Sequence, residues 1–194
     1  MSQPLSLAFV TAVPAVDMLP PTRSEVALIG RSNVGKSSLL NALAGNRVLA
    51  AVSNTPGRTQ LLHCFRVEPG QSTLVDCPGY GFAKAPKDVR VHFAPMIEAY
   101  LLEREQLAMT VLLADGEIGP TKSDLQMLDW LRENSLPVFI VATKHDQVPP
   151  SHRHRRQNEV AAACRIEPAN MLWVSSKAGL GIDRLRELVR LWLA

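Results

Sequence analysis

A glycine-rich segment near the start of the chain constrains its fold more than any other feature. Residues 30–37 read GRSNVGKS and fit the pattern G-x-x-x-x-G-K-S/T. An apolar run precedes the segment at 25–30, and leucines at helical spacing follow it within 36–45, which ends in glycine. A strand, a tight turn and a helix in this order direct backbone N–H groups and a helix N-terminus at an anion. The segment therefore predicts a phosphate-binding loop between a buried strand and a helix.

Apolar runs alternate with helical patterns along the rest of the chain. Most of these runs are apolar on both faces, which is typical of parallel strands covered by helices on two sides. The runs 60–68 and 72–79 flank a short proline-glycine turn and predict an antiparallel hairpin. We expect an α/β fold, in which a mostly parallel six-stranded sheet has one antiparallel strand and helices on both faces. The expected strands are 25–30, 60–68, 72–79, 109–115, 137–144 and 170–176, and the expected helices are 36–45, 88–106, 122–134, 151–164 and 181–193.

Residues 1–24 differ from the rest because prolines at 4, 14, 20 and 21 interrupt them. Proline fixes φ and donates no backbone hydrogen bond, so a regular helix is not expected there. We predict an extended arm with one edge strand near 7–11, followed by a single domain at 25–194.

Composition narrows the class of protein but does not identify it. The net charge of +3 allows an anionic partner without indicating which. Three cysteines, an odd and low number, argue against a disulfide framework and for a reducing compartment. No apolar run approaches the ~18 residues that span a bilayer. We expect a cytoplasmic monomer that does not associate with membranes.

Three short motifs after the phosphate loop indicate which nucleotide it binds. Residues 76–79 (DCPG) match D-x-x-G, residues 143–146 (TKHD) resemble N/T-K-x-D, and residues 175–177 (SSK) resemble S-A-K. Each motif follows a predicted strand, and the carboxyl ends of strands are where α/β sheets bind ligands. The carboxylate of Asp146 can accept from guanine N1–H and N2–H, a donor pair that adenine lacks. The motifs therefore predict a site for GTP and GDP.

The same motifs suggest how the phosphates and a metal are held. Lys36 would reach the β- and γ-phosphates, and the N–H of Gly79 would sense the γ-phosphate. Ser37 and Asp76 would hold Mg²⁺, which prefers oxygen ligands. The stem of Lys144 would cover the face of the base, and backbone N–H groups of 175–177 would bond the guanine carbonyl.

These motifs, together with residues 55–60 (TPGRTQ) and 76–83 (DCPGYGFA), resemble the EngB/YihA family of bacterial ribosome-biogenesis GTPases, within the TrmE-Era-EngA-EngB-Septin-like superfamily. The resemblance covers nearly the whole chain. It implies a Ras-like P-loop GTPase domain in which Thr59 closes on Mg²⁺ and the γ-phosphate. It also implies association with the large ribosomal subunit during assembly, through rRNA or ribosomal proteins, and a need in cell division and septation. Residues 115–120 depart from the family because they lack the basic residues expected there.

The motifs and the resemblance together assign the site residues. The expected nucleotide contacts are Gly30, Arg31, Ser32, Asn33, Val34, Gly35, Lys36, Ser37, Ser38, Gly57, Arg58, Thr59, Gln60, Leu61, Asp76, Cys77, Pro78, Gly79, Thr143, Lys144, His145, Asp146, Ser175, Ser176 and Lys177. The expected Mg²⁺ ligands are Ser37, Thr59 and Asp76, and the expected catalytic residues are Lys36, Thr59 and Asn33.

Hydrolysis is expected to be slow. Many Ras-like enzymes orient the attacking water with a glutamine directly after D-x-x-G, where this chain has Tyr80. A phenol cannot supply the paired donor and acceptor of a carboxamide. Asn33 offers a K⁺ site that would offset charge beside the phosphates, and a purely loop-stabilising role for Asn33 is an equal alternative. Arg58 would either offset charge as an arginine finger or, the favoured alternative, anchor the backbone or contact a partner.

Two basic regions are candidates for a partner surface. Residues 152–156 (HRHRR) would form either a nucleic-acid patch or a solvated helix start. Lys84, Lys87 and Arg90 lie just after the D-x-x-G motif, where RNA contact would depend on the nucleotide state. Tyr80, Phe82 and Phe93 would either stack on bases or, more in keeping with their position, pack within the protein.

Two other functions compete with a GTPase switch. A constitutive RNA-binding module with a degenerate nucleotide site would bind its partner equally with and without GTP. A P-loop kinase or ATPase would bind ATP but not GDP. The intact set of Lys36, Ser37, Asp76 and Asp146 argues against the RNA-binding module.

Overall fold

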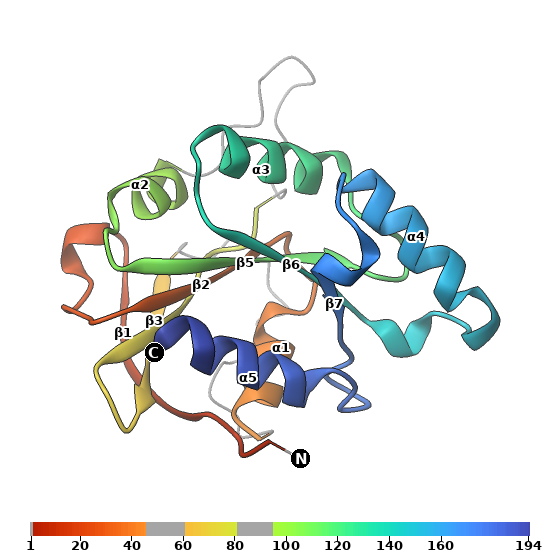
Figure 1. Ribbon diagram of the computed structural model, residues 1–194. Helices are drawn as coiled ribbons and strands as arrows, with labels where there is room; N and C mark the ends of the chain where they lie inside the picture. Colours follow the sequence, from red (N-terminus) through yellow and green to blue (C-terminus); the bar gives the residue numbers. More distant parts are fainter. Residues whose placement is uncertain (1, 46–60, 81–94) are drawn as a thin grey trace.

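The computed structural model describes residues 2–45, 61–80 and 95–194. In this part of the chain the strands form one seven-stranded sheet in the order β1-β3-β4-β2-β5-β6-β7 (Figure 1). β3 runs antiparallel to both neighbours, and the other adjacent pairs are parallel. The strands are β1 (Ser6–Val13), β2 (Glu25–Gly30), β3 (Leu62–Glu68), β4 (Ser72–Asp76), β5 (Leu107–Asp115), β6 (Val138–Thr143) and β7 (Met171–Trp173).

Helices cover both faces of this sheet, which confirms the predicted α/β class. α2, α3 and α4 lie on one face, and α1 and α5 lie on the other (Figure 1). A 3-10 turn at Val16–Met18 interrupts the otherwise extended arm. The helices are α1 (Lys36–Leu43), α2 (Pro95–Glu103), α3 (Lys122–Glu133), α4 (Arg153–Ala163) and α5 (Ile182–Leu193).

The central strand β2 is buried on both faces because it separates two hydrophobic cores. Ala27 and Ile29 belong to the core beneath α2, α3 and α4, whereas Val26 and Leu28 belong to the core beneath α1 and α5. Successive side chains of a strand point to opposite faces, so a strand between two helical layers is apolar at every inner position. This arrangement explains the apolar run that precedes the phosphate loop.

The sheet contains one strand more than the six expected, because the arm contributes β1. This strand pairs with β3 from Ser6 opposite Glu68 to Val13 opposite Leu62, with an irregularity between Phe9 and Thr11. The arm strand predicted near 7–11 is therefore present and longer. The predicted hairpin is also present, as β3 and β4.

Several predicted boundaries shift when tertiary contacts are considered. The last strand ends at Trp173 rather than 176, because Ser175 turns back to pair with Leu180. The strand expected at 72–79 ends at Asp76. α2 begins at Pro95, a residue tolerated in the first turn of a helix, and the predicted start at 88 lies outside the described residues.

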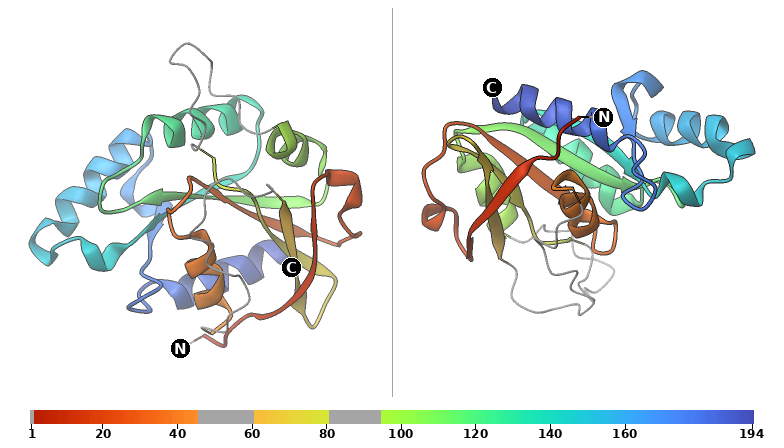
Figure 2. Two further views of the ribbon diagram at one scale, coloured as in Figure 1. Left: turned by 180° about the vertical axis from the view of Figure 1, so that it is seen from behind. Right: turned by 90° about the horizontal axis from the view of Figure 1, so that it is seen from below.

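Hydrogen bonds join the arm to α5, and α5 to the end of α1. Arg186 of α5 donates to the carbonyls of Ala42 (2.7 Å) and Leu43 (3.0 Å), which satisfies acceptors at the end of α1. Ser2 donates to Asp183 of α5 at 3.0 Å, and the chain's N-terminus lies beside this helix (Figure 2). These contacts hold the arm, α1 and α5 together directly before residue 46.

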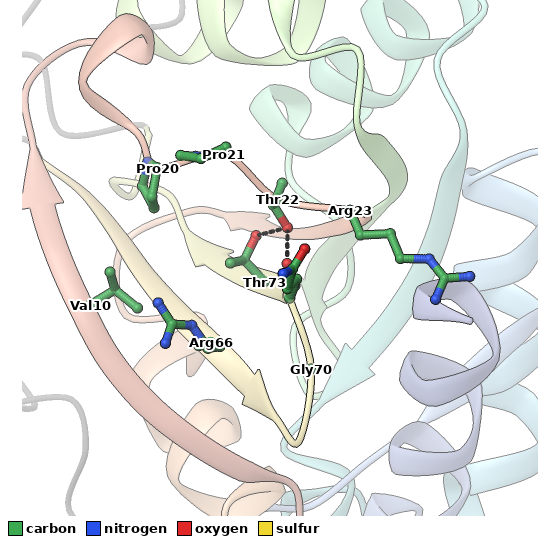
Figure 3. Close-up of a pocket in the computed structure, with 9 residues that line it drawn as sticks. Val10, Pro20, Pro21, Thr22, Arg23, Arg66, Gly70 and Thr73 are labelled. Carbon is green, nitrogen blue, oxygen red and sulfur yellow. Dashed lines mark hydrogen bonds between the residues drawn. The ribbon is translucent and has the colours of Figure 1, made fainter.

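A hollow of about 390 Å³ lies between the arm and the β3–β4 hairpin, near the N-terminal end of β2 (Figure 3). Its hydroxyl groups have partners within the protein. Thr73 donates to Glu25 at 2.6 Å, its hydroxyl oxygen lies 3.0 Å from that of Thr22, and Thr22 donates to the carbonyl of Gln71 at 2.8 Å. Arg104 pairs with the fully buried carboxylate of Glu25 at 3.1 Å. This end of the sheet is opposite the motifs, and its polar groups are used in joining the arm to the sheet.

Candidate guanine-nucleotide site

The phosphate loop joins the end of β2 to the start of α1, as the sequence predicts. Gly35 precedes the helix with φ of 105°, and Asn33 has φ of 63°. A Cβ atom on Gly30 would lie 2.9 Å from Val34 Cγ1 and 3.0 Å from Leu113 Cβ. Glycine at 30 therefore permits close packing against β5, and glycine at 35 permits the left-handed turn into α1.

Lys36 folds back over this loop. Its Nζ donates to the carbonyl of Gly30 at 3.1 Å. Burial lowers the pKa of Lys36, and the nearby Asp76 opposes that shift. The ammonium is thus held above the loop, where a phosphate would replace or supplement its carbonyl partner.

Asp76 closes β4 beside the phosphate loop. Its Oδ1 is buried and has no hydrogen-bond partner among the described residues. Burial raises the pKa of Asp76 to about 6, and Lys36 opposes the rise. An unpartnered buried carboxylate oxygen is costly unless a ligand satisfies it. Together with the hydroxyl of Ser37 in the first turn of α1, this donor set fits Mg²⁺.

The D-x-x-G motif lies directly against the phosphate loop. A Cβ atom on Gly79 would lie 2.6 Å from Ser32 Oγ and 2.9 Å from Ser32 N. Ser32 N in turn donates to the carbonyl of Tyr80 at 3.2 Å. Any side chain at 79 would therefore push the two loops apart.

The side chain of Tyr80, the residue that directly follows D-x-x-G, is bonded to α3. Its side chain is buried, and its hydroxyl donates to Asp124 Oδ1 at 2.9 Å. Asp124 also caps α3 by accepting from the N–H (2.8 Å) and hydroxyl (2.7 Å) of Thr121. Tyr80 therefore packs within the protein, which is the alternative favoured over base stacking.

The base-reading motif begins at Thr143, the last residue of β6. Its hydroxyl donates to the carbonyl of Val34 at 2.7 Å, which ties this motif to the phosphate loop. Lys144 then has φ of 56°, and its Nζ donates to Asp115 Oδ2 at 2.6 Å. The two motifs are thus in contact although more than 100 residues separate them.

The SSK motif contacts the base-reading motif at Asp146. Ser175 Oγ donates to Asp146 Oδ1 at 2.5 Å and accepts from Ala178 N at 2.9 Å. His145 N donates to the carbonyl of Val174 at 3.0 Å, and the His145 ring lies 5.3 Å from the Trp173 ring. Burial lowers the pKa of His145, with a smaller contribution from Arg153. The TKHD and SSK segments therefore form one connected unit.

Part of the expected site lies outside the described residues. This part comprises Gly57, Arg58, Thr59, Gln60, Phe82, Lys84, Lys87, Arg90 and Phe93. Of the other expected contacts, Asn33, Ser38 and Lys177 are exposed, and Cys77 is buried next to Asp76. Leu61 is half-buried directly before β3. The assigned roles of all these residues stay predictions.

The sequence reasoning missed two carboxylates that contact site residues, Asp115 and Asp124. Asp115 ends β5 at the same sheet edge as the motifs, and this position was a usable signal. Asp124 follows Thr121 by three residues, the spacing of a helix capping box. Their partners, Lys144 and Tyr80, are distant in sequence and gave no local signal.

The basic segment 152–156 is partly neutralised by its own helix. Arg155 and Arg156 both pair with Glu159, at 3.4 and 3.2 Å. Arg153 Nε donates to the carbonyl of Val148 at 3.2 Å. This segment is therefore a weaker candidate for binding anions than its sequence indicates.

A phosphate loop, a D-x-x-G motif and a base-reading pair at one edge of this α/β sheet define a P-loop GTPase. Residues 25–144 match the protein family described as 50S ribosome-binding GTPase. The probable GTP-binding protein EngB of Pelobacter propionicus is 44% identical over 185 residues, which cover 95% of this chain and 92% of the relative. That of Mycoplasmopsis synoviae is 48% identical over 164 residues, 84% of this chain and 87% of the relative. The chain belongs to the EngB family of GTP-binding proteins and binds GTP and GDP.

Solved structures agree with this fold. The crystal structure of a probable GTP-binding protein EngB has a TM-score of 0.67 and 22% identity, covering 88% of this chain and 98% of that one. Era in complex with MgGDPNP and nucleotides 1506–1542 of 16S ribosomal RNA has a TM-score of 0.63 and 22% identity, covering 90% of this chain and 58% of that one. No helix within the described residues is long and apolar enough to cross a membrane.

Proposed function

We propose that this GTPase is a cytoplasmic switch in the assembly of the large ribosomal subunit, and that cell division and septation depend on it through that role. Its GTP form would bind rRNA or ribosomal proteins, and its GDP form would release them. The description of the matching family, 50S ribosome-binding GTPase, supports this partner. The observation that carries the switch is the direct contact of Gly79 with Ser32, because a γ-phosphate in the loop must act on both.

In this proposal the chain's own residues divide the work on the nucleotide. Lys36 and the loop N–H groups bind the β- and γ-phosphates, and Asp146 and Lys144 hold the base. Ser37 and Asp76, joined by Thr59, hold Mg²⁺. When bound, Mg²⁺ supplies positive charge that offsets the charge developing on the phosphates.

Hydrolysis is expected to be slow because Tyr80 is held by α3 and no glutamine follows D-x-x-G. Asn33, exposed in the loop, is the proposed contact for a K⁺ ion beside the phosphates. Single-turnover hydrolysis should then be faster in KCl than in NaCl. Equal rates in the two salts would remove the K⁺ role and leave Asn33 as a loop residue.

Co-sedimentation with purified ribosomal subunits tests the partner. We expect the monomeric protein to pellet with large subunits in a non-hydrolysable GTP analogue and much less in GDP. Lys36→Met is the matched variant, because it should lose the nucleotide dependence while keeping the surface. Equal binding with the analogue, with GDP and without nucleotide would favour the second candidate, a constitutive RNA-binding module.

A further inference from the structure

The carboxylate at the end of β5 is fixed on one side and offers its other oxygen to the base-reading motif. Asp115 lies opposite Thr143 in the parallel pairing of β5 and β6, and its side chain is only 4% exposed. Its Oδ1 accepts from the N–H groups of Glu117 (3.0 Å) and Ile118 (3.3 Å). Its Oδ2 accepts from Lys144 Nζ at 2.6 Å. The orientation of the carboxylate is therefore set by its own loop, independently of Lys144.

The loop after Asp115 packs closely against the strand ends that carry the motif. A Cβ atom on Gly116 would lie 2.5 Å from the carbonyl of Thr143 and 2.7 Å from the ring of Trp173. Gly116 N also donates to the carbonyl of Thr143 at 2.9 Å. The distance between the Asp115 carboxylate and the backbone of Lys144 is thus fixed by close packing.

Lys144 is restrained at both ends of its side chain. Its backbone has φ of 56°, in the left-handed region, and its ammonium is tied to Asp115. The side chain is 32% exposed, so part of it faces solvent. A free lysine side chain has several rotatable bonds, and ordering such a side chain on binding costs conformational entropy. Here a protein contact provides the ordering before any ligand binds.

We propose that Asp115 is a positioning residue for guanine: it anchors the ammonium of Lys144, so that the lysine stem is ordered in advance as a surface for the base. This inference rests on the proposed role of Lys144 and Asp146 in holding the base. None of residues 116–120 carries a cationic side chain that could compete with Lys144 for Asp115.

The test is a double-mutant cycle on nucleotide affinity. Titrations of GDP and GTP are compared for the wild type, Asp115→Asn, Lys144→Met and the double variant. Asp115→Asn keeps an oxygen for the two loop N–H groups but loses the charge. We expect it to raise both dissociation constants by about twofold to tenfold, and equally for GDP and GTP. In the Lys144→Met background, which keeps the stem but lacks the ammonium, the same change should add nothing.

The controls separate this role from a structural one. Glu117→Gln removes an exposed neighbouring carboxylate and should leave both affinities at the wild-type value. Unchanged affinity in Asp115→Asn, or an equal loss in the Lys144→Met background, would overturn the proposal. If Asp115→Asn does not fold, the Lys144→Met variant alone tests the proposal. It should bind GDP and GTP twofold to tenfold more weakly than the wild type. Unchanged affinity would refute the positioning role.

A separate arm tests the base site itself. Asp146→Asn is titrated with xanthosine diphosphate and GDP. If Asp146→Asn gains binding of xanthosine diphosphate but Asp115→Asn binds GDP and GTP with unchanged affinity, only the positioning role of Asp115 is refuted. Absence of that gain would refute the base site, and the positioning role with it.

Discussion

The two halves of the nucleotide site differ in how their polar groups are satisfied. At the base-reading end, Lys144 is paired with Asp115 and Asp146 with Ser175, through contacts within the protein. At the phosphate end, Asp76 Oδ1 has no partner among the described residues, and the ammonium of Lys36 rests on a carbonyl of its own loop.

This difference suggests that the base-reading end discriminates between bases, whereas the phosphate end changes when the nucleotide binds. Groups that already have their bonding geometry lose little freedom on binding, which favours discrimination between bases. Groups that are buried and unsatisfied gain most when a charged ligand arrives, so binding there can shift the surrounding segments. We infer that the base-reading end changes little between nucleotide states and that the phosphate end changes most.

The largest effect should come from the phosphate end. Lys36→Met removes the charge expected to contact two phosphates and should weaken GDP binding by about 100-fold or more. Guanosine, which has no phosphate, should bind the variant and the wild type alike. Calorimetric titration with both ligands measures this, and a parallel loss of guanosine binding would contradict the separation of the two halves.

Replacing Asp76 or Asp115 with asparagine should change the free energy of unfolding in opposite directions. Asp76→Asn removes the charge of a buried carboxylate whose Oδ1 has no hydrogen-bond partner among the described residues, and should raise the free energy of unfolding of the nucleotide-free protein by about 1–3 kcal/mol. The same variant should lose the Mg²⁺ dependence of GTP binding.

Asp115→Asn is the matched comparison, because it breaks the partly buried ion pair with Lys144 instead. It should lower the free energy of unfolding by about 1–3 kcal/mol. Urea denaturation without nucleotide measures both changes. Changes of the same sign would show that the two carboxylates are equally well satisfied.

A smaller effect is expected at the junction between the D-x-x-G motif and α3. Tyr80→Phe leaves Asp124 Oδ1 without its hydroxyl partner, and should lower the free energy of unfolding by about 1–2 kcal/mol. Because the hydroxyl points to α3, GDP affinity should change less than twofold. A large loss of affinity with unchanged stability would place this hydroxyl in the nucleotide site.

The smallest effect concerns pH at the base-reading end. Burial lowers the pKa of His145 below its ordinary value of 6.5, so the unfolded chain takes up this proton more readily than the folded protein. His145 therefore contributes stability that is complete above pH 6.5 and is lost as the pH falls through its folded pKa. Thermal unfolding of His145→Gln should show a shallower loss of stability below pH 6.5, and an unchanged slope would refute this.

Local patterns were enough to predict the backbone of the site. The phosphate loop follows from glycines at fixed spacing, and the parallel sheet follows from runs such as 25–30 that are apolar at every inner position. Short segments of the sequence are therefore enough to predict the class of fold and the order of the motifs along the sheet edge. The seventh strand is the edge strand predicted in the arm, and only its length was underestimated.

The side-chain pairings could not be predicted, because each joins positions far apart in the chain. Lys144 and Asp115 are 29 residues apart, and Tyr80 and Asp124 are 44 apart. Nothing in either neighbourhood indicates the partner. The neutralisation of Arg155 and Arg156 could have been predicted, since Glu159 follows them at helical spacing.

The most direct test of the account is a titration of the wild type and Asp146→Asn with GTP and xanthosine triphosphate. An asparagine at 146 replaces one of the two acceptor oxygens expected to face the base with an amide donor, while the phosphate end is unchanged. The account predicts that the variant loses GTP by about 100-fold or more and gains xanthosine triphosphate. A variant that keeps its preference for GTP would contradict the assignment of base recognition to Asp146.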